Sequence, residues 1–301
     1  MKIGWVGTGI MGSRMVRHLL EEGHHVKVHD KTDSAATSLV NAGASWARNP
    51  RETAMNTDVT FIMVAYPWQV EQVVLDDCDG VLEGIPPQGI IVDCTTSTPE
   101  LEVRIANEAR SRSVETLDAP VSGGPSGAKD GTLSFMVGGP KETFERVLPL
   151  LRLMGEKINL IGPAGAGQHA KMVNQIMIAA NMMGTCEAYV YARKMDLPLD
   201  RVFDSVSGGA AKSFILSFAW PRISRNDLEP GFHIEHFLKD LGIVLAEAER
   251  KDLCLPATSL TRELYHAARA CGGIKKGTQA LILALESLNG IHNQNRRLTE
   301  L

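Results

Sequence analysis

The sequence lacks several patterns that define other protein classes. Its five cysteines, at positions 78, 94, 186, 254 and 271, form no CxxC pair and leave an odd one, which is typical of buried, reduced thiols. No apolar run reaches the roughly 20 residues that cross a bilayer, and no long basic run is present to bind nucleic acid. We therefore expect no membrane partner and no nucleic-acid partner. Because a strand-like run begins at once, we expect no signal peptide and a cytoplasmic protein.

Length and composition indicate a globular protein of more than one domain. The 301 residues are 44% hydrophobic and 22% charged, with a formal net charge of −4. Such a composition is typical of folded chains. Length alone suggests about two domains.

Strand-like and helical patterns alternate through the first half of the chain. The strand-like runs are 2–6, 25–29, 59–64, 89–93, 114–117, 132–137 and 157–161, with amphipathic segments such as 99–111 and 140–153 between them. This alternation predicts an α/β fold with an N-terminal Rossmann-type, doubly wound, mainly parallel sheet.

Strand-like runs stop near Gly162-Pro163-Ala164-Gly165, and helical spacing then continues. We predict one long helix over 166–195 and further helices over 199–206, 236–250, 257–271 and 277–288. The predicted domains are a dinucleotide-binding domain over 1–163, an all-α substrate and oligomerisation domain over 164–289, and a polar tail over 290–301.

A glycine-rich turn joins the first strand-like run to the first helical one. It reads Gly7-Thr8-Gly9-Ile10-Met11-Gly12. Gly7 permits a tight turn, Gly9 lets the backbone approach a pyrophosphate, and Gly12 allows close packing of helix and strand. The second strand ends at Asp30, where a carboxylate can bond a ribose hydroxyl. The pattern predicts a dinucleotide site, and the alternative is a glycine turn without a ligand.

Lys171 and Asn174 lie three residues apart on the predicted long helix and therefore share a face near the domain link. A cofactor and a small substrate would meet in a cleft there. Partial desolvation of a lysine disfavours its charged form and lowers its pKa toward the range useful for proton transfer. From spacing alone, a solvated surface lysine is the favoured interpretation.

Four further segments favour proton transfer over a solvated surface position for Lys171. They are 118–128, which contains Asp118-Ala119-Pro120-Val121-Ser122-Gly123-Gly124; 167–174, which follows G-x-x-x-K-x-x-N; 237–241, which contains Lys239; and 93–99, which contains Thr96. With the glycine turn, these segments resemble the β-hydroxyacid dehydrogenase family in order and spacing. That group includes 3-hydroxyisobutyrate dehydrogenase and tartronate semialdehyde reductase.

The resemblance implies hydride transfer between NAD(P) and the alcohol carbon of a small 3-hydroxy acid, or reduction of its semialdehyde. It implies that Lys171 is the general acid and base, that the loop with Thr96 lies against the nicotinamide, and that Lys239 reaches the active site. The alternative for Lys239 is a solvated helix charge paired with Asp240 or Glu235.

The substrate is expected to carry a carboxylate. Ser122, Gly123 and Gly124 offer a hydroxyl and bare backbone N–H groups to such an anion, or else form a structural turn. Asn174 would orient the substrate. Phe232 would close the apolar side of the pocket, or serve as a core aromatic.

Two departures from the family pattern bear on specificity. Tyr66 stands where a smaller aliphatic residue is usual, so the pocket edge is expected to differ. Asp30, followed by Lys31 and Thr32, suits the free ribose hydroxyl of NAD and would repel a 2′-phosphate. NAD is therefore favoured over NADP.

Other functions stay open at this point. A 6-phosphogluconate dehydrogenase shares the lysine helix, although K-x-x-H-N is usual there; relatives that reduce imines usually replace the lysine. A catalytically silent dinucleotide-binding scaffold is the alternative from another class. We expect no metal, because His233 and His236 lack further ligands.

We expect a homodimer or homotetramer, since the long helix carries small and apolar residues beyond one stripe. They include Ala179, Ala180, Gly184, Ala188, Tyr189, Val190 and Ala192.

Overall fold

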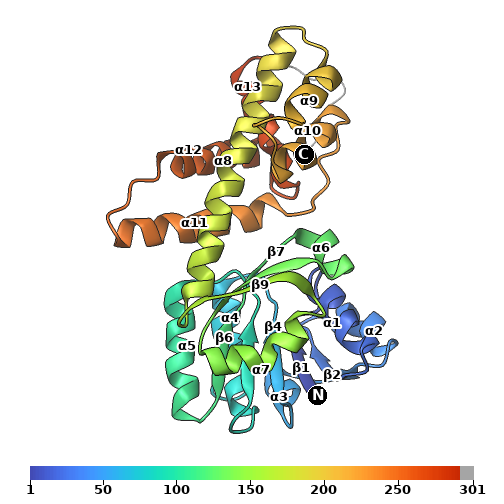
Figure 1. Cartoon of the computed structure of the whole chain (residues 1–301), viewed down its shortest axis with the longest axis vertical. Helices are drawn as coiled ribbons and strands as arrows, with labels where there is room; N and C mark the ends of the chain where they lie inside the picture. Colours follow the sequence, from blue (N-terminus) through green and yellow to red (C-terminus); the bar gives the residue numbers. More distant parts are fainter. Residues whose placement is uncertain (292–301) are drawn as a thin grey trace. The chain divides into compact units, whose positions relative to one another are not determined.

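The computed structural model describes residues 1–291 (Figure 1). The chain divides into two compact units, Met1–Lys171 and a second that begins at Met172. The sequence placed a domain boundary earlier, after residue 163. The first turns of the long helix belong to the first unit because buried side chains of that unit bind them. Of the predicted tail, residues 292–301 lie outside the described part of the chain.

Within residues 1–291, a nine-stranded sheet forms the centre of the first unit. Its strands are β1 (Lys2–Val6), β2 (His25–His29), β3 (Ser45–Trp46), β4 (Val59–Ile62), β5 (Ile90–Asp93), β6 (Glu115–Asp118), β7 (Val121–Ser122), β8 (Leu133–Gly138) and β9 (Gly155–Gly162). The order is β3-β2-β1-β4-β5-β6-β8-β7, with β9 beside β8. Strands β1 to β6 pair in parallel, and β8 is antiparallel to β6 and β7. The predicted mainly parallel, doubly wound sheet is confirmed.

Helices cover both faces of this sheet. They are α1 (Gly12–Glu21), α2 (Asp33–Val40), α3 (Pro50–Ala54), α4 (Pro67–Leu75), α5 (Pro99–Ser111), α6 (Gly124–Asp130) and α7 (Lys141–Leu151). Successive residues of a strand point to opposite faces. Accordingly Phe61 packs in one hydrophobic core with α1 and α7, and Ile62 packs in another with α4 and α5.

The second unit is helical, as predicted. The long helix α8 (Ala166–Lys194) leads into it, followed by α9 (Leu199–Ser207), α10 (Phe214–Ser224), α11 (Ile234–Arg250), α12 (Pro256–Ala268) and α13 (Ile282–Leu288). Its core gathers large buried side chains, including Tyr189, Trp220, Phe237 and Tyr265. The predicted helix over 277–288 is a 3-10 turn (Thr278–Leu281) followed by α13.

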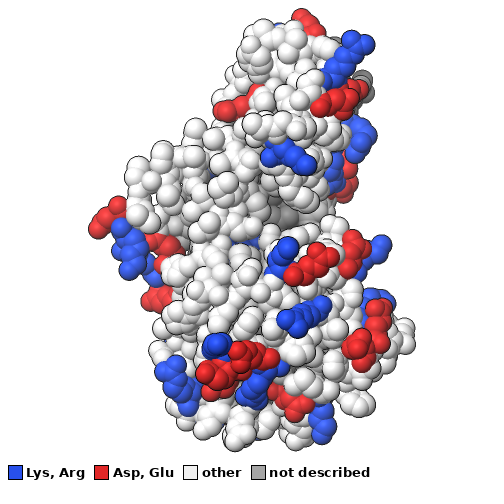
Figure 2. All heavy atoms as spheres, in the orientation of Figure 1, with Lys and Arg blue, Asp and Glu red and all other residues white. Residues whose placement is uncertain are grey.

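Charged side chains of both signs are interspersed on the face drawn in Figure 2. Among the described residues, no helix is both long and apolar enough to cross a membrane.

Candidate active site

The glycine turn at the end of β1 contains Gly7, Gly9 and Gly12. A side chain would clash with the protein at Gly7 and Gly12 but not at Gly9. Gly7 has φ 95°, and a Cβ there would collide with the carbonyl oxygen of Met63. A Cβ at Gly12 would collide with the carbonyl oxygen of Gly7. A Cβ at Gly9 would meet no atom within 4 Å. Gly7 and Gly12 therefore serve the fold, whereas Gly9 leaves exposed backbone that a ligand can approach.

Asp30 holds this turn from the end of β2. Its Oδ2 accepts hydrogen bonds from the Thr8 backbone N–H at 2.7 Å and the Thr8 hydroxyl at 3.1 Å, and its Oδ1 accepts from Thr32 N–H at 3.1 Å. A carboxylate has about four lone-pair sites, so acceptor capacity is left for a further donor. Asp30 thus fixes Thr8 while keeping its charge beside the turn. Ile10 and Lys31 are exposed, and Met11 is half-buried.

The segment after β5 is fixed by its own polar groups. Thr95 N–H donates to Asp93 Oδ1 at 2.8 Å, and the Thr95 hydroxyl accepts from Val64 N–H at 3.1 Å. Thr96 is half-buried between the buried Thr95 and Ser97. Cys94 is 1% exposed, and burial raises the pKa of its thiol well above the ordinary value. Cys94 is a packed thiol, as the sequence favoured. The expectation of buried thiols is wrong for Cys78 and Cys254, which are exposed.

Two buried acids lie under this segment. Burial raises the pKa of Asp93 to about 6 and raises that of Glu102, on α5, well above its ordinary value. Repulsion between the two carboxyl groups raises the pKa of Glu102 further. Burial disfavours the charged forms, so this pair retains a proton more readily than exposed acids do.

Asp118, at the end of β6, holds the start of α8. Its Oδ1 accepts from Gly165 N–H and its Oδ2 from Gln168 N–H, both at 2.8 Å. These are N–H groups that helical bonding leaves free at a helix start. Burial raises the pKa of Asp118, and the two N–H bonds act against that rise. A Cβ at Gly167 would collide with the Met136 carbonyl oxygen, so glycine is required there for this close approach.

Lys171 is buried in the second turn of α8. It is 7% exposed, and its Nζ donates to the Val121 carbonyl oxygen at 2.8 Å. A solvated surface lysine, the interpretation favoured by spacing alone, is therefore wrong. Val121 directly precedes Ser122, so the amine lies beside the segment in which the sequence predicts carboxylate binding.

That segment turns sharply from β7 into α6. Ser122 is half-buried, and Gly123 and Gly124 have φ of 129° and 63°. L-residues with side chains rarely adopt such angles. A Cβ at Gly124 would meet nothing within 4 Å. Gly124 thus leaves backbone open close to the partner of Lys171, whereas a Cβ at Gly123 would lie 3.2 Å from Leu133 Cδ2.

A chain of contacts within the second unit links Asn174 to Lys239. Asn174 donates to Gln175 Oε1 at 2.7 Å, and Gln175 donates to Asp240 Oδ2. Lys239 Nζ lies 2.9 Å from Asp240 Oδ1, and the Lys239 side chain is 14% exposed. The predicted pairing of Lys239 with Asp240 is present, but the pair is largely buried rather than solvated.

Phe232 packs at the edge of the second core, with its ring centroid 5.8 Å from that of Phe237. The rings of His233 and His236 have centroids 5.7 Å apart. Within residues 1–291, no group of three or more His, Cys, Asp or Glu residues could hold a metal ion.

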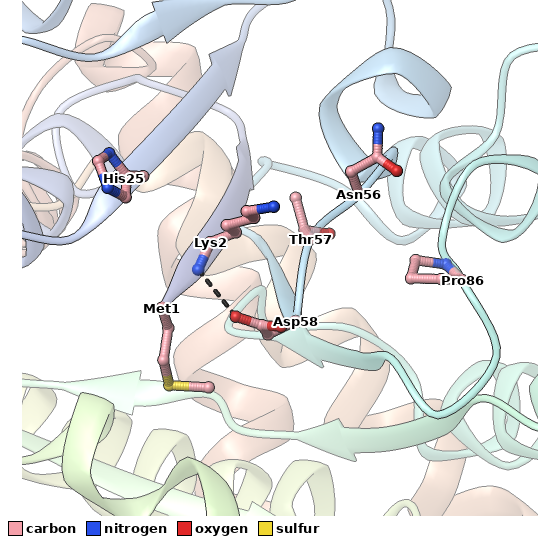
Figure 3. Close-up of a pocket in the computed structure, with 7 residues that line it drawn as sticks. All are labelled: Met1, Lys2, His25, Asn56, Thr57, Asp58 and Pro86. Atoms are coloured by element: carbon pink, nitrogen blue, oxygen red, sulfur yellow. Dashed lines mark hydrogen bonds between the residues drawn. The ribbon is translucent and has the colours of Figure 1, made fainter.

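A surface hollow of about 420 Å³ lies elsewhere (Figure 3). It is lined by Met1, Lys2, His25, Asn56, Thr57, Asp58 and Pro86. Lys2 N–H donates to Asp58 Oδ2 at 2.8 Å across it. These residues stand at the amino ends of β1, β2 and β4 or, for Pro86, before β5. The glycine turn stands at the carboxyl end of β1, where α/β sheets bind ligands. No predicted site residue lines this hollow.

Sequence reasoning gave no individual role to Asp118, Gln168 or the Val121 carbonyl. Asp118 and the Val121 carbonyl bind the lysine helix, and Gln168, on that helix, binds the backbone of Thr95 and Ser97. The burial of Glu102 could have been predicted from the sequence. Glu102 lies next to Leu101 on the inward face of an amphipathic helix, where an acid is unexpected.

Comparison with known proteins covers nearly the whole chain. A family model described as the NAD binding domain of 6-phosphogluconate dehydrogenase matches residues 2–162. Another, described as NAD-binding of NADP-dependent 3-hydroxyisobutyrate dehydrogenase, matches residues 165–285.

Similar proteins share this span. The chain is 45% identical over 294 residues to a probable 3-hydroxyisobutyrate dehydrogenase-like 1, mitochondrial, of Arabidopsis thaliana, covering 98% of this chain and 88% of the relative. It is 38% identical over 286 residues to 2-hydroxy-3-oxopropionate reductase of Escherichia coli, covering 95% and 97%. A solved structure of Mycobacterium tuberculosis 3-hydroxyisobutyrate dehydrogenase with L-serine matches with TM-score 0.86 and 30% identity, covering 94% and 98%.

Proposed function

Since the chain belongs to the β-hydroxyacid dehydrogenase family, NAD(P)-dependent oxidoreductases that act on CH–OH groups, we propose that its substrate is a small 3-hydroxy acid. The acid resembles 3-hydroxyisobutyrate, and the reverse reaction reduces the matching semialdehyde. The observation that carries this proposal is the buried Lys171 amine, 2.8 Å from the Val121 carbonyl and next to Ser122, Gly123 and Gly124.

The residues of the first unit fit a dinucleotide. Gly9 leaves a space that a Cβ would fill, at the start of a helix whose N–H groups favour an anion. The turn from Gly7 to Gly12, with Thr8, Ile10 and Met11, would hold the pyrophosphate, and Thr96 would lie against the nicotinamide. The nicotinamide ring, when bound, accepts or returns the hydride.

Lys171 moves the proton. In oxidation, its neutral Nζ takes the hydroxyl proton while the hydride leaves the same alcohol carbon; in reduction, its ammonium returns a proton to the carbonyl oxygen. Ser122, Gly123 and Gly124 bind the substrate carboxylate through the hydroxyl and backbone N–H groups. Asn174 orients the substrate, Lys239 adds positive charge for the carboxylate and cofactor, and Phe232 supplies an apolar wall.

NAD is the preferred cofactor in this proposal. Asp30 keeps a carboxylate beside the turn, with lone pairs left after its bonds to Thr8 and Thr32. These can accept from a ribose hydroxyl, and the negative charge disfavours a 2′-phosphate. Lys31, which is exposed next to Asp30, carries a positive charge that favours a 2′-phosphate and therefore NADP. Calorimetric titration with both cofactors tests the preference, and tighter binding of NADP would show that Lys31 outweighs Asp30.

A spectrophotometric screen tests the substrate class. Small 3-hydroxy acids and semialdehydes are assayed with NAD and with NADP, beside the alcohols that lack the carboxylate as matched controls. We expect turnover of the acids and little turnover of those alcohols. Turnover of 6-phosphogluconate or of cyclic imines, with none of the small acids, would contradict the proposal.

Self-association is also proposed. Val173, Met177 and Tyr191 expose apolar side chains along α8. Four of the residues named from the sequence are instead buried in the core of their own unit: Ala179, Tyr189, Val190 and Ala192. Long helices with exposed apolar positions favour packing against another chain. Light scattering at micromolar concentration should give a homodimer or homotetramer, and the mass of one chain would refute self-association.

The five free cysteines support a cytoplasmic location, which cell fractionation would test.

A further inference from the structure

Gln168 joins the helix of Lys171 to the segment of Thr96. Its side chain is fully buried, at 0% exposed. Its Nε2 donates to the Thr95 carbonyl oxygen at 2.8 Å, and its Oε1 accepts from Ser97 N–H at 3.0 Å. One amide therefore binds the backbone on both sides of Thr96, as a neighbouring β-strand would.

The same residue is tied to α8 by its backbone. Gln168 N–H donates to Asp118 Oδ2, and Lys171 follows three residues later, about one helical turn away. The start of α8 is thus held by Asp118 on one side and by the Thr95–Ser97 backbone on the other. A shift of that backbone relative to Lys171 requires that at least one of these buried bonds break.

We propose that Gln168 is a positioning residue for hydride transfer, which sets the place of Thr96, and of the nicotinamide against it, relative to Lys171. This inference rests on the proposed function. It assigns Gln168 no contact with the substrate or the cofactor. Hydride transfer depends steeply on alignment of the reacting atoms, so a small displacement of this segment slows the chemical step.

This position requires a donor to the Thr95 carbonyl and an acceptor for Ser97 N–H, and glutamine supplies both. Its amide supplies a donor and an acceptor, whereas Glu would lose the donor to Thr95 and add a charge near the buried Asp118 and Asp93. Met has a similar length and supplies neither bond. Gln168→Met therefore removes both contacts with little change in volume.

Gln279 provides a matched control in the second unit. It is also 0% exposed, and its Nε2 donates to the carbonyl oxygens of Asp227 and Glu229 at 3.1 and 3.0 Å. Gln279→Met also removes two hydrogen bonds from a buried amide to backbone. A merely structural role for Gln168 predicts the same behaviour from both variants.

The first experiment measures steady-state kinetics with protiated and deuterated hydroxy acid. For Gln168→Met we expect kcat to fall ~10-fold or more, with the KM of the hydroxy acid within about twofold of wild type and a larger primary isotope effect on kcat/KM. Gln279→Met should lower the melting temperature and leave the isotope effect unchanged. Equal kcat and isotope effects in the two variants would overturn the proposal.

A binding experiment needs no substrate, and so separates this inference from the proposed function. Gln168→Met should bind NAD more weakly than wild type but bind ADP-ribose, which lacks the nicotinamide, equally well. Equal affinity for NAD in wild type and variant, or equal losses for both ligands, would refute the role, even if the wild type oxidised no hydroxy acid. Should Gln168→Met fail to fold, Gln168→Leu, which is also uncharged and also lacks both hydrogen bonds, carries the same comparison.

Discussion

Lys171 and Lys239 are both largely buried, but their amines meet different partners. Lys171 donates to a neutral carbonyl, that of Val121, at 2.8 Å, whereas Lys239 lies 2.9 Å from the carboxylate of Asp240. A carbonyl oxygen accepts from an ammonium and, more weakly, from a neutral amine. A carboxylate stabilises the ammonium specifically. On this comparison we propose that Lys171 exchanges the proton and that Lys239 supplies positive charge.

The largest expected effect follows from replacing Lys171. Lys171→Ala should lower kcat by ~10²-fold or more, the usual scale for loss of general acid and base catalysis. Cofactor affinity should stay near that of wild type, because the glycine turn and Asp30 are unchanged. Steady-state kinetics and calorimetry measure the two effects.

Lys171→Arg separates loss of the base from loss of the positive charge, because guanidinium stays protonated and cannot serve as a base. It should not restore the rate. A Lys171→Ala enzyme with normal kcat and only a raised KM would instead make Lys171 a carboxylate-binding residue.

Lys239→Ala should act on binding more than on chemistry. Loss of its charge should raise the KM of the hydroxy acid ~10-fold, with a smaller change in kcat, the signature of lost uniform binding. Lys239→Arg, which keeps the charge, should recover much of the loss. If Lys239→Ala lowered kcat as far as Lys171→Ala does, the division of roles between the two lysines would be wrong.

A smaller effect concerns stability. The pKa of Asp93 is raised to about 6 from 3.8, and that of Glu102 is raised above 4.5, so the folded state holds protons that the unfolded state has released. The contribution of these two acids to stability is therefore fully present below the unfolded values and is lost as pH rises through the folded ones. Glu102→Gln removes one of these protonation equilibria.

The loss of melting temperature between about pH 5 and about pH 8 should be smaller in Glu102→Gln than in wild type. Glu100→Gln is the matched control, because Glu100 is an exposed acid in the first turn of the same helix. An unchanged loss in Glu102→Gln would show that this buried carboxyl group does not titrate as described.

The sequence predicted the parts of the site that depend on local pattern. The glycine turn follows an apolar strand and was readable from spacing, whereas spacing alone favoured a solvated Lys171 and only the family resemblance pointed to a role for it. Partners distant in sequence were not readable from spacing. Gln168 binds Thr95 and Ser97 across 73 and 71 positions, and no local period indicates such a pairing.

Some elements of the fold were missed for similar reasons. Helix α10 contains Pro221, which normally argues against a helix interior, and its burial depends on packing of Trp220 in the second core. Strands β3 and β7 have two residues each, too few for an alternating pattern.

Chemical rescue of Lys171→Ala tests the central claim most directly. Small primary amines are added during alcohol oxidation by Lys171→Ala and by Lys239→Ala, and the rate is followed as a function of amine basicity and pH. If Lys171 transfers the proton, the amines should restore part of the lost rate in Lys171→Ala, more strongly as their neutral form increases, and should leave Lys239→Ala unchanged. No rescue of Lys171→Ala, or rescue confined to Lys239→Ala, would contradict the assignment of proton transfer to Lys171.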